Sequence, residues 1–98
     1  MSEIAFEWDE RKNRRNIQKH GIDFNRAALI FRGPVVERVD DREDYGEERL
    51  IALGLVGQDV YRVVFTEPEE NVIRLISVQK AGKLESEIYH DQTKSIRH

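Results

Sequence analysis

The chain has 98 residues, which is the size of one small domain and too short for two catalytic domains. Hydrophobic residues make up 39% and charged residues 36%, so the chain can form a core, but a thin one beneath a heavily charged surface. These values predict a single domain over residues 1–98, with a frayed tail over residues 93–98.

Several classes of protein are disfavoured at the outset. The apolar runs over residues 50–56 and 60–65 are much shorter than the roughly 20 residues that cross a bilayer. The N-terminus lacks the basic and apolar regions of a secretory signal, so we expect a cytoplasmic protein without membrane contact. The chain has no cysteine, and its three histidines, at positions 20, 90 and 98, do not have the spacing of metal ligands. We therefore predict neither a metal site nor a cofactor.

The formal net charge is -3, but the charges are unevenly distributed along the chain. Basic residues predominate toward both ends, and acidic residues predominate in the middle. This distribution has two interpretations: a mixed, solvated surface, or a cationic surface formed where the two ends meet in the fold.

The first elements are a short strand over residues 4–8 and a helix that follows it. Asp9 is a good N-cap for the helix, and Gly21 is a left-handed C-cap directly after His20. The helix has one large aliphatic residue, Ile17, so it buries a narrow stripe and leaves much of its surface to water or to a partner. That stripe is expected to include three polar side chains, those of Asn13, Asn16 and His20.

The remaining elements complete an α+β pattern. Asp23 caps a second helix whose apolar residues recur over 24–31 at the spacing of one buried face, and Gly33-Pro34 ends it. Four strands and a C-terminal helix follow, with a turn over residues 40–46, a hairpin connection at 57–59 and a loop over 67–71; the elements are expected at 35–39, 48–56, 60–66, 72–80 and 83–92. We predict a small antiparallel sheet with two N-terminal helices and one C-terminal helix, all on one face.

Side-chain alternation sorts the residues of the last two strands between the two faces of the sheet. It places Tyr61 and Arg62 on opposite faces. In the last strand it places Arg74 and Lys80 on one face and Ser77 and Gln79 on the other, unless a bulge shifts the register.

Ordered motifs along the chain resemble those of one known family. Residues 8–21 read W-D-x-x-K-x-x-x-N-x-x-K-H-G, which resembles the opening signature of the BrnT toxins of bacterial type II toxin–antitoxin systems. Further matches in the same order are D-Y-G-E-E-R at 44–49, L-G-L at 53–55, T-E at 66–67 and R-L-I-S at 74–77. Several ordered matches at near-constant spacing are a specific signal, and together they span almost the whole chain.

The resemblance implies a fold and a function. It implies a RelE-like ribonuclease fold, metal-independent RNA cleavage that inhibits translation, and neutralisation by a BrnA-like antitoxin. It also implies contact with operator DNA only through the antitoxin, and an assembly with the antitoxin such as a heterotetramer. RNA can be cut by attack of its own 2′-hydroxyl on the adjacent phosphate, which needs a base, an acid and cations but no covalent nucleophile.

The candidate catalytic residues follow from the same resemblance. His20 lies in the opening signature, and histidine is a common general acid or base, but it can equally cap the carbonyl end of its helix. Lys80, Glu85 and Tyr89 resemble the family's terminal K-A-x-x-x-E-x-x-x-Y, although Tyr89 can equally pin the helix to the sheet. Candidate ligands for RNA phosphates are the cations of the first helix and two arginines of the sheet, namely Lys12, Arg14, Arg15, Lys19, Arg62 and Arg74. The segment 44–49 has the pattern of a turn with surface charges and is a weak functional signal.

Departures from the family pattern favour a second hypothesis. Gln79 stands where the family commonly has an arginine, and Pro68 stands where many relatives have one. The last helix is also less basic than is usual in the family. Loss of positive charge weakens RNA binding, so the alternative function is that of a weakened or inactive toxin that binds the antitoxin and acts as a co-repressor.

Overall fold

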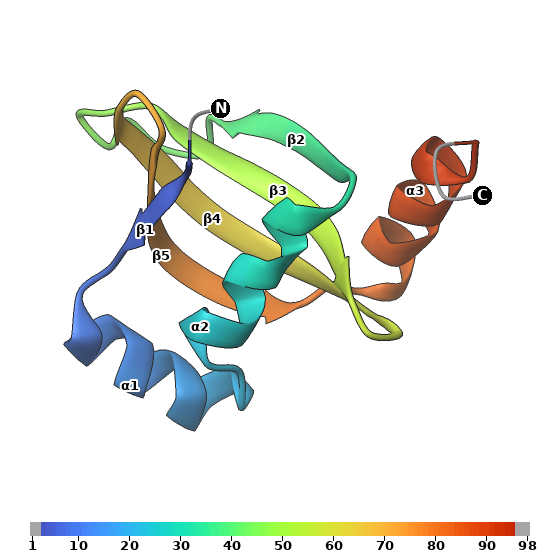
Figure 1. Cartoon of the computed structure of the whole chain (residues 1–98), viewed down its shortest axis with the longest axis horizontal. Coiled ribbons are helices and arrows are strands. Elements are labelled where there is room, and N and C mark those ends of the chain that lie inside the picture. The colour runs from blue at the N-terminus through green and yellow to red at the C-terminus, as the bar shows by residue number, and fades with distance from the viewer. Residues whose placement is uncertain (1–2, 96–98) are drawn as a thin grey trace.

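The computed structural model describes residues 3–95 and confirms the predicted order of elements. Figure 1 shows a strongly twisted sheet with α2 in front of it, α1 at the lower left and α3 at the right. The strands are β1 (Ala5–Glu7), β2 (Val35–Asp40), β3 (Arg49–Val56), β4 (Asp59–Glu69) and β5 (Val72–Lys80). The helices are α1 (Glu10–His20), α2 (Phe24–Ala27), the 3-10 helix η1 (Ala28–Arg32) and α3 (Lys83–Thr93).

The sheet is mixed, which corrects the prediction of a purely antiparallel one. Its five strands have the order β1-β5-β4-β3-β2, and β1 pairs parallel to β5, whereas the other three pairings are antiparallel. The first strand therefore lies beside the last (Figure 1). A single sequence does not reveal this pairing, because nothing local in a three-residue strand specifies its partner.

The helices cover both faces of the sheet, so the expectation that all would lie on one face is wrong. Phe24 and Ile30 pack with Ala52 in the larger buried cluster, whereas Tyr89 of α3 packs with Leu53 in a second cluster. Ala52 and Leu53 are consecutive in β3 and point to opposite faces. We call these the α2 face and the α3 face of the sheet.

The second helix differs from the predicted regular one. It has a single α-helical turn and continues as η1, so Ile30 is fully buried while Phe31 is half-buried and stacks edge-on against Phe65. Close approach of η1 to the sheet depends on Gly54, since a Cβ there would overlap the Cβ of Ile30. The tighter 3-10 turn therefore seats an isoleucine directly over a glycine of β3.

The last two strands differ from the prediction in length and in register. β4 runs through Glu69, so the predicted loop over residues 67–71 is reduced to a turn in which Asn71 has φ 61°. The pairing of β5 shifts at Ile76, because Ser77 pairs with Val64 while Leu75 pairs with Phe65. This bulge shifts the register, so the faces predicted from simple alternation do not hold. Arg74, Ser77 and Gln79 share the α3 face, and Lys80 lies on the α2 face.

Helix α1 is held by buried amides rather than by apolar packing. Asn13 and Asn16 are buried as predicted, but the expectation that Ile17 and His20 would share the buried stripe is wrong, because both are exposed. Asn16 Nδ2 donates to the Ile22 carbonyl and its Oδ1 accepts from the Val78 N–H, each at 3.0 Å. Asn13 Oδ1 accepts from the Phe24 N–H at 2.9 Å. Two side chains therefore tie α1 to the start of α2 and to β5.

The C-terminal helix extends one residue beyond the predicted end. Thr93, which was expected in the frayed tail, is the last residue of α3, is 2% exposed, and donates its hydroxyl to the Tyr89 carbonyl at 2.7 Å. The rest of the predicted tail includes residues 96–98, which lie outside the described residues.

Replacement of Asn16 by alanine tests how α1 is held. Asn16→Ala leaves two buried backbone groups unpaired, so we expect a loss of about 2–4 kcal/mol in the free energy of unfolding. Urea denaturation measures this loss. Gln18→Ala, at an exposed position of the same helix, is the control and should change stability by less than about 0.5 kcal/mol. Equal effects of the two substitutions would contradict the anchoring role.

Candidate functional site

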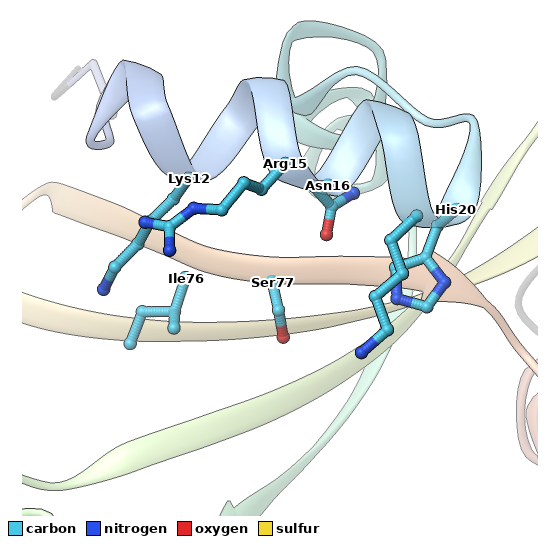
Figure 2. A pocket seen from close by; sticks show the side chains of 7 residues that line it. Lys12, Arg15, Asn16, His20, Ile76 and Ser77 are labelled. Carbon is cyan, nitrogen blue, oxygen red and sulfur yellow. The ribbon is translucent and has the colours of Figure 1, made fainter.

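A basic hollow lies between α1 and β5. It has a volume of about 200 Å³. Figure 2 shows that side chains of α1 extend toward β5 near Ile76 and Ser77. Its lining comprises Lys12, Arg15, Asn16, Lys19, His20, Ile76 and Ser77. We call it the basic pocket; four of the predicted site residues meet there.

Helical periodicity and the Asn16 anchor together create this pocket. Lys12, Arg15 and Lys19 recur at intervals of three and four residues and therefore share one side of α1. Asn16 lies on the same side and is bound to β5, so the anchor holds this row of cations against the strand. Arg14 is exposed on α1 and does not line the pocket.

His20 is available for chemistry because the helix end is capped without it. Gly21 has φ 72°, and its N–H donates to the Ile17 carbonyl at 2.7 Å. Within residues 3–95, the His20 side chain makes no hydrogen bond with a carbonyl of the helix. It is exposed and lines the basic pocket. An imidazole, three cations and the Ser77 hydroxyl surround a hollow suited to an anion.

Three further candidates lie on the α3 face of the sheet. Arg62 Nε donates to Glu85 Oε2 at 3.2 Å, and the side chains are 13% and 27% exposed, so this ion pair is partly buried. Gln79 pairs with Arg62 across the sheet. Arg74 lies on the same face and forms an ion pair with Glu7 at 2.6 Å, with both partners well exposed.

Besides Glu85, two more of the predicted catalytic residues lie away from the basic pocket. Lys80 points to the α2 face, is exposed, and its Nζ lies 3.2 Å from Asp59 Oδ1. Tyr89 is fully buried in the second cluster and donates its hydroxyl to the Pro34 carbonyl at 2.9 Å. The Tyr89 contacts are those of a residue that fastens α3 to the beginning of β2.

The segment 44–49, which had a weak functional signal, lies beside a polar cluster of Asp40 and Arg42. Asp40 is buried, and Arg42 binds its carboxylate through Nε and Nη2, each at 2.7 Å. These hydrogen bonds from Arg42 are the main reason that the pKa of Asp40 is lowered to about 2. The guanidinium of Arg49 stacks on the Tyr45 ring at 3.9 Å from its centroid. Sequence analysis did not single out Arg49, although it ends the D-Y-G-E-E-R motif.

No group of three or more His, Cys, Asp or Glu side chains in residues 3–95 is arranged to hold a metal ion. No helix within the same residues is long and apolar enough to cross a membrane.

The fold and the pocket define the class: a small α+β protein that presents cations around an anion-sized hollow. Residues 8–85 match the sequence family described as the ribonuclease toxin BrnT of type II toxin–antitoxin systems. The chain therefore belongs to the BrnT family of ribonuclease toxins, and membership of a toxin–antitoxin family implies an antitoxin partner.

A solved structure of the same family is similar in fold. The crystal structure of the Brucella abortus ribonuclease toxin BrnT matches with a TM-score of 0.62 and 28% sequence identity. The match covers 82% of this chain and 99% of the Brucella chain. A search of curated protein sequences gave no match.

A conservative substitution separates the two interpretations of Tyr89. Tyr89→Phe removes the hydrogen bond to the Pro34 carbonyl, so we expect a loss of about 1 kcal/mol in the free energy of unfolding. We expect the rate of RNA cleavage to be unchanged under conditions in which both proteins are folded. Urea denaturation and a cleavage assay measure the two effects. A large loss of rate with unchanged stability would instead assign the hydroxyl to the chemistry.

Proposed function

We propose that this chain is a metal-independent endoribonuclease toxin that binds RNA across the basic pocket and the α3 face of the sheet. The observation that carries the proposal is the meeting of Lys12, Arg15, Lys19 and His20 beside Ser77. Cleavage by the RNA 2′-hydroxyl needs proton transfer and stabilisation of a crowded, charged phosphate. These side chains are of the types that supply both functions.

We assign the roles as follows. His20 exchanges a proton with the 2′-hydroxyl or with the leaving 5′-oxygen, because an imidazole has ring nitrogens that can accept or donate a proton. Lys12, Arg15 and Lys19 neutralise the phosphate and hold it in the pocket. Arg62 and Glu85 form a second polar position on the α3 face, where they orient the RNA chain.

The partner and its effect form the second part of the proposal. A BrnA-like antitoxin covers the RNA-binding face and silences the toxin by steric occlusion, and contact with operator DNA passes through that antitoxin. Free toxin acts in the cytoplasm and inhibits translation by cutting RNA, and its fold is of the RelE type. A heterotetramer is the assembly that we propose for the complex.

A second candidate function is antitoxin binding and co-repression without efficient catalysis. Gln79 favours it, since this neutral residue pairs with Arg62 on the proposed RNA face, where the family commonly has an arginine. A neutral amide can hydrogen-bond to a phosphate but cannot offset its charge.

The direct test of the proposed function is RNA cleavage in excess EDTA. We expect products with cyclic-phosphate or 3′-phosphate ends and 5′-hydroxyl ends, because the attacking group is the 2′-hydroxyl of the RNA. Product ends are identified by mass spectrometry. A requirement for added magnesium would contradict the metal-independent reaction. Absence of cleavage together with tight antitoxin binding would favour the second candidate function.

Two adjacent arginines test the position of the RNA-binding surface. Arg15 lines the basic pocket and Arg14 does not, although both are on α1. Arg15→Gln should weaken binding of a single-stranded RNA and reduce the slope of log affinity against log salt by about 0.7. Arg14→Gln removes the same charge and should have a smaller effect. Fluorescence anisotropy at several salt concentrations measures both, and equal effects would mean that only overall charge matters.

Restoring positive charge tests whether Gln79 limits activity. Removal of one preorganised stabilising group typically lowers a rate on the order of 100-fold to 1,000-fold, so Gln79→Arg should raise the cleavage rate at least about tenfold. Gln58→Arg adds the same charge in the exposed β3–β4 turn and serves as the control. An equal response of the two variants would show that position 79 has no special role.

A further inference from the structure

Two buried polar atoms on the α3 face have no hydrogen-bond partner. They are Thr66 Oγ1 and Arg49 Nε, and these are the buried side-chain nitrogen and oxygen atoms without a partner among residues 3–95. Thr66 is 2% exposed and Arg49 is half-buried. A buried polar group without a partner costs free energy, and an anion or water that binds there removes the cost.

The strand register places these atoms in one row with another arginine. Thr66 pairs directly with Arg74 of β5. On the opposite side of β4 lies β3, in which Leu50 pairs with Phe65. Arg49 and Thr66 are the residues next to that pair, so they lie opposite each other and share the α3 face. The row Arg49, Thr66 and Arg74 therefore crosses three neighbouring strands, with a hydroxyl between two guanidinium groups.

The Arg49 guanidinium forms no ion pair in residues 3–95, although Glu47, Glu48 and Glu67 line the hollow that Thr66 also lines. Asp40 lies opposite Arg49 in the register, but Arg42 already binds both of its carboxylate oxygens. The guanidinium of Arg49 stacks on Tyr45. Stacking holds the guanidinium plane but leaves its N–H groups to bind something else.

Arg74 forms an ion pair with Glu7, but both side chains are exposed to solvent. Its ion pair with Glu7 has side chains that are 46% and 44% exposed. Exposed pairs of this kind contribute little free energy, so a stronger anion can displace Glu7.

We propose that Arg49, Thr66 and Arg74 form a second phosphate-binding position, which holds a phosphodiester group of the RNA. The inference rests on the proposed function and adds to it three residues outside the basic pocket. Guanidinium groups only donate hydrogen bonds, and the hydroxyl between them can donate one more, so the matching ligand is an anion with several acceptor oxygens. The Thr66 hydroxyl is covered in this structure, so the proposed binding requires the side chains that cover it to move aside.

The position of this row fits an RNA chain that also enters the basic pocket. Arg74 and Ser77 lie on the same face of β5, and three residues of a strand span about 10 Å. An RNA strand that runs along β5 therefore contacts the row with one phosphate and the basic pocket with another. The row also gives a role to three segments that carry the family resemblance, since they end or begin at Arg49, Thr66 and Arg74.

The experiment measures binding of a short 2′-O-methyl RNA, which cannot be cleaved by its own 2′-oxygen. Arg49→Gln should weaken binding about tenfold and reduce the salt slope by about 0.7, since one charged contact is lost. Thr66→Val should weaken binding several-fold without a change in salt slope, because the hydroxyl is uncharged. Thr66→Ser should bind like the unmodified chain, and Glu7→Gln should bind more tightly because Arg74 is released.

Matched controls separate this inference from effects of folding and net charge. Arg32→Gln removes one exposed positive charge of η1 and should leave binding almost unchanged. Thermal unfolding should show that Thr66→Val is as stable as the parent or more so, because valine removes an unpaired hydroxyl. A purely structural Thr66 predicts the same stability with unchanged RNA binding, which would overturn the inference.

The outcomes also distinguish this inference from the proposed function. If Arg15→Gln weakens binding while Arg49→Gln and Thr66→Val do not, the basic pocket binds RNA, and Arg49, Thr66 and Arg74 do not form a phosphate-binding position. If the unmodified chain fails to bind the 2′-O-methyl RNA at any salt concentration, the proposed function and this inference are both wrong.

Discussion

The amide of Asn16 is the contact on which the candidate site depends. β1 pairs with β5 only as far as Arg74, and farther along the strand Asn16 accepts the hydrogen bond of the Val78 N–H. The same amide donates to the Ile22 carbonyl and so fixes the turn between α1 and α2. Because α1 has little apolar surface, directional hydrogen bonds must hold it, and these also fix which side of the helix faces the strand. The basic pocket is a consequence of that orientation.

The two faces of the sheet differ in what they carry: the α2 face holds the larger hydrophobic cluster, and the α3 face holds most of the polar residues discussed above. On the α2 face, an aromatic and aliphatic cluster closes over Gly54, where the absence of a side chain lets Ile30 approach the sheet. The α3 face is covered by α3 near Leu53; farther along β4 and β5 it carries polar residues together with the buried Val64. The shift in pairing at Ile76 brings Arg74 onto the same face as Ser77 and thereby aligns two polar groups of β5. Local backbone irregularity in one strand therefore determines which cations share a surface.

Acidic side chains limit the effect of the positive charges. Glu85 binds Arg62, Glu7 binds Arg74 and Asp59 binds Lys80. The candidate cations of the basic pocket have no such carboxylate neighbour in the described part of the chain. A net charge of -3 is thus compatible with a local cationic surface, since electrostatic attraction at a contact depends on nearby unpaired charges.

The sequence by itself determined the order of elements, the capped helix up to His20, the hairpin of β3 and β4, and membership of the BrnT family, because these depend on local periodicity, caps and ordered motifs. It also indicated that the first helix carries candidate phosphate ligands, among them Lys12, Arg15 and Lys19. Only the tertiary structure decided that β1 lies parallel to β5, that Lys80 and Tyr89 lie away from the basic pocket, and that Arg49 neighbours Thr66. The physical reason is that pairing partners, bulges and burial are set by contacts between distant segments, and no local pattern specifies them.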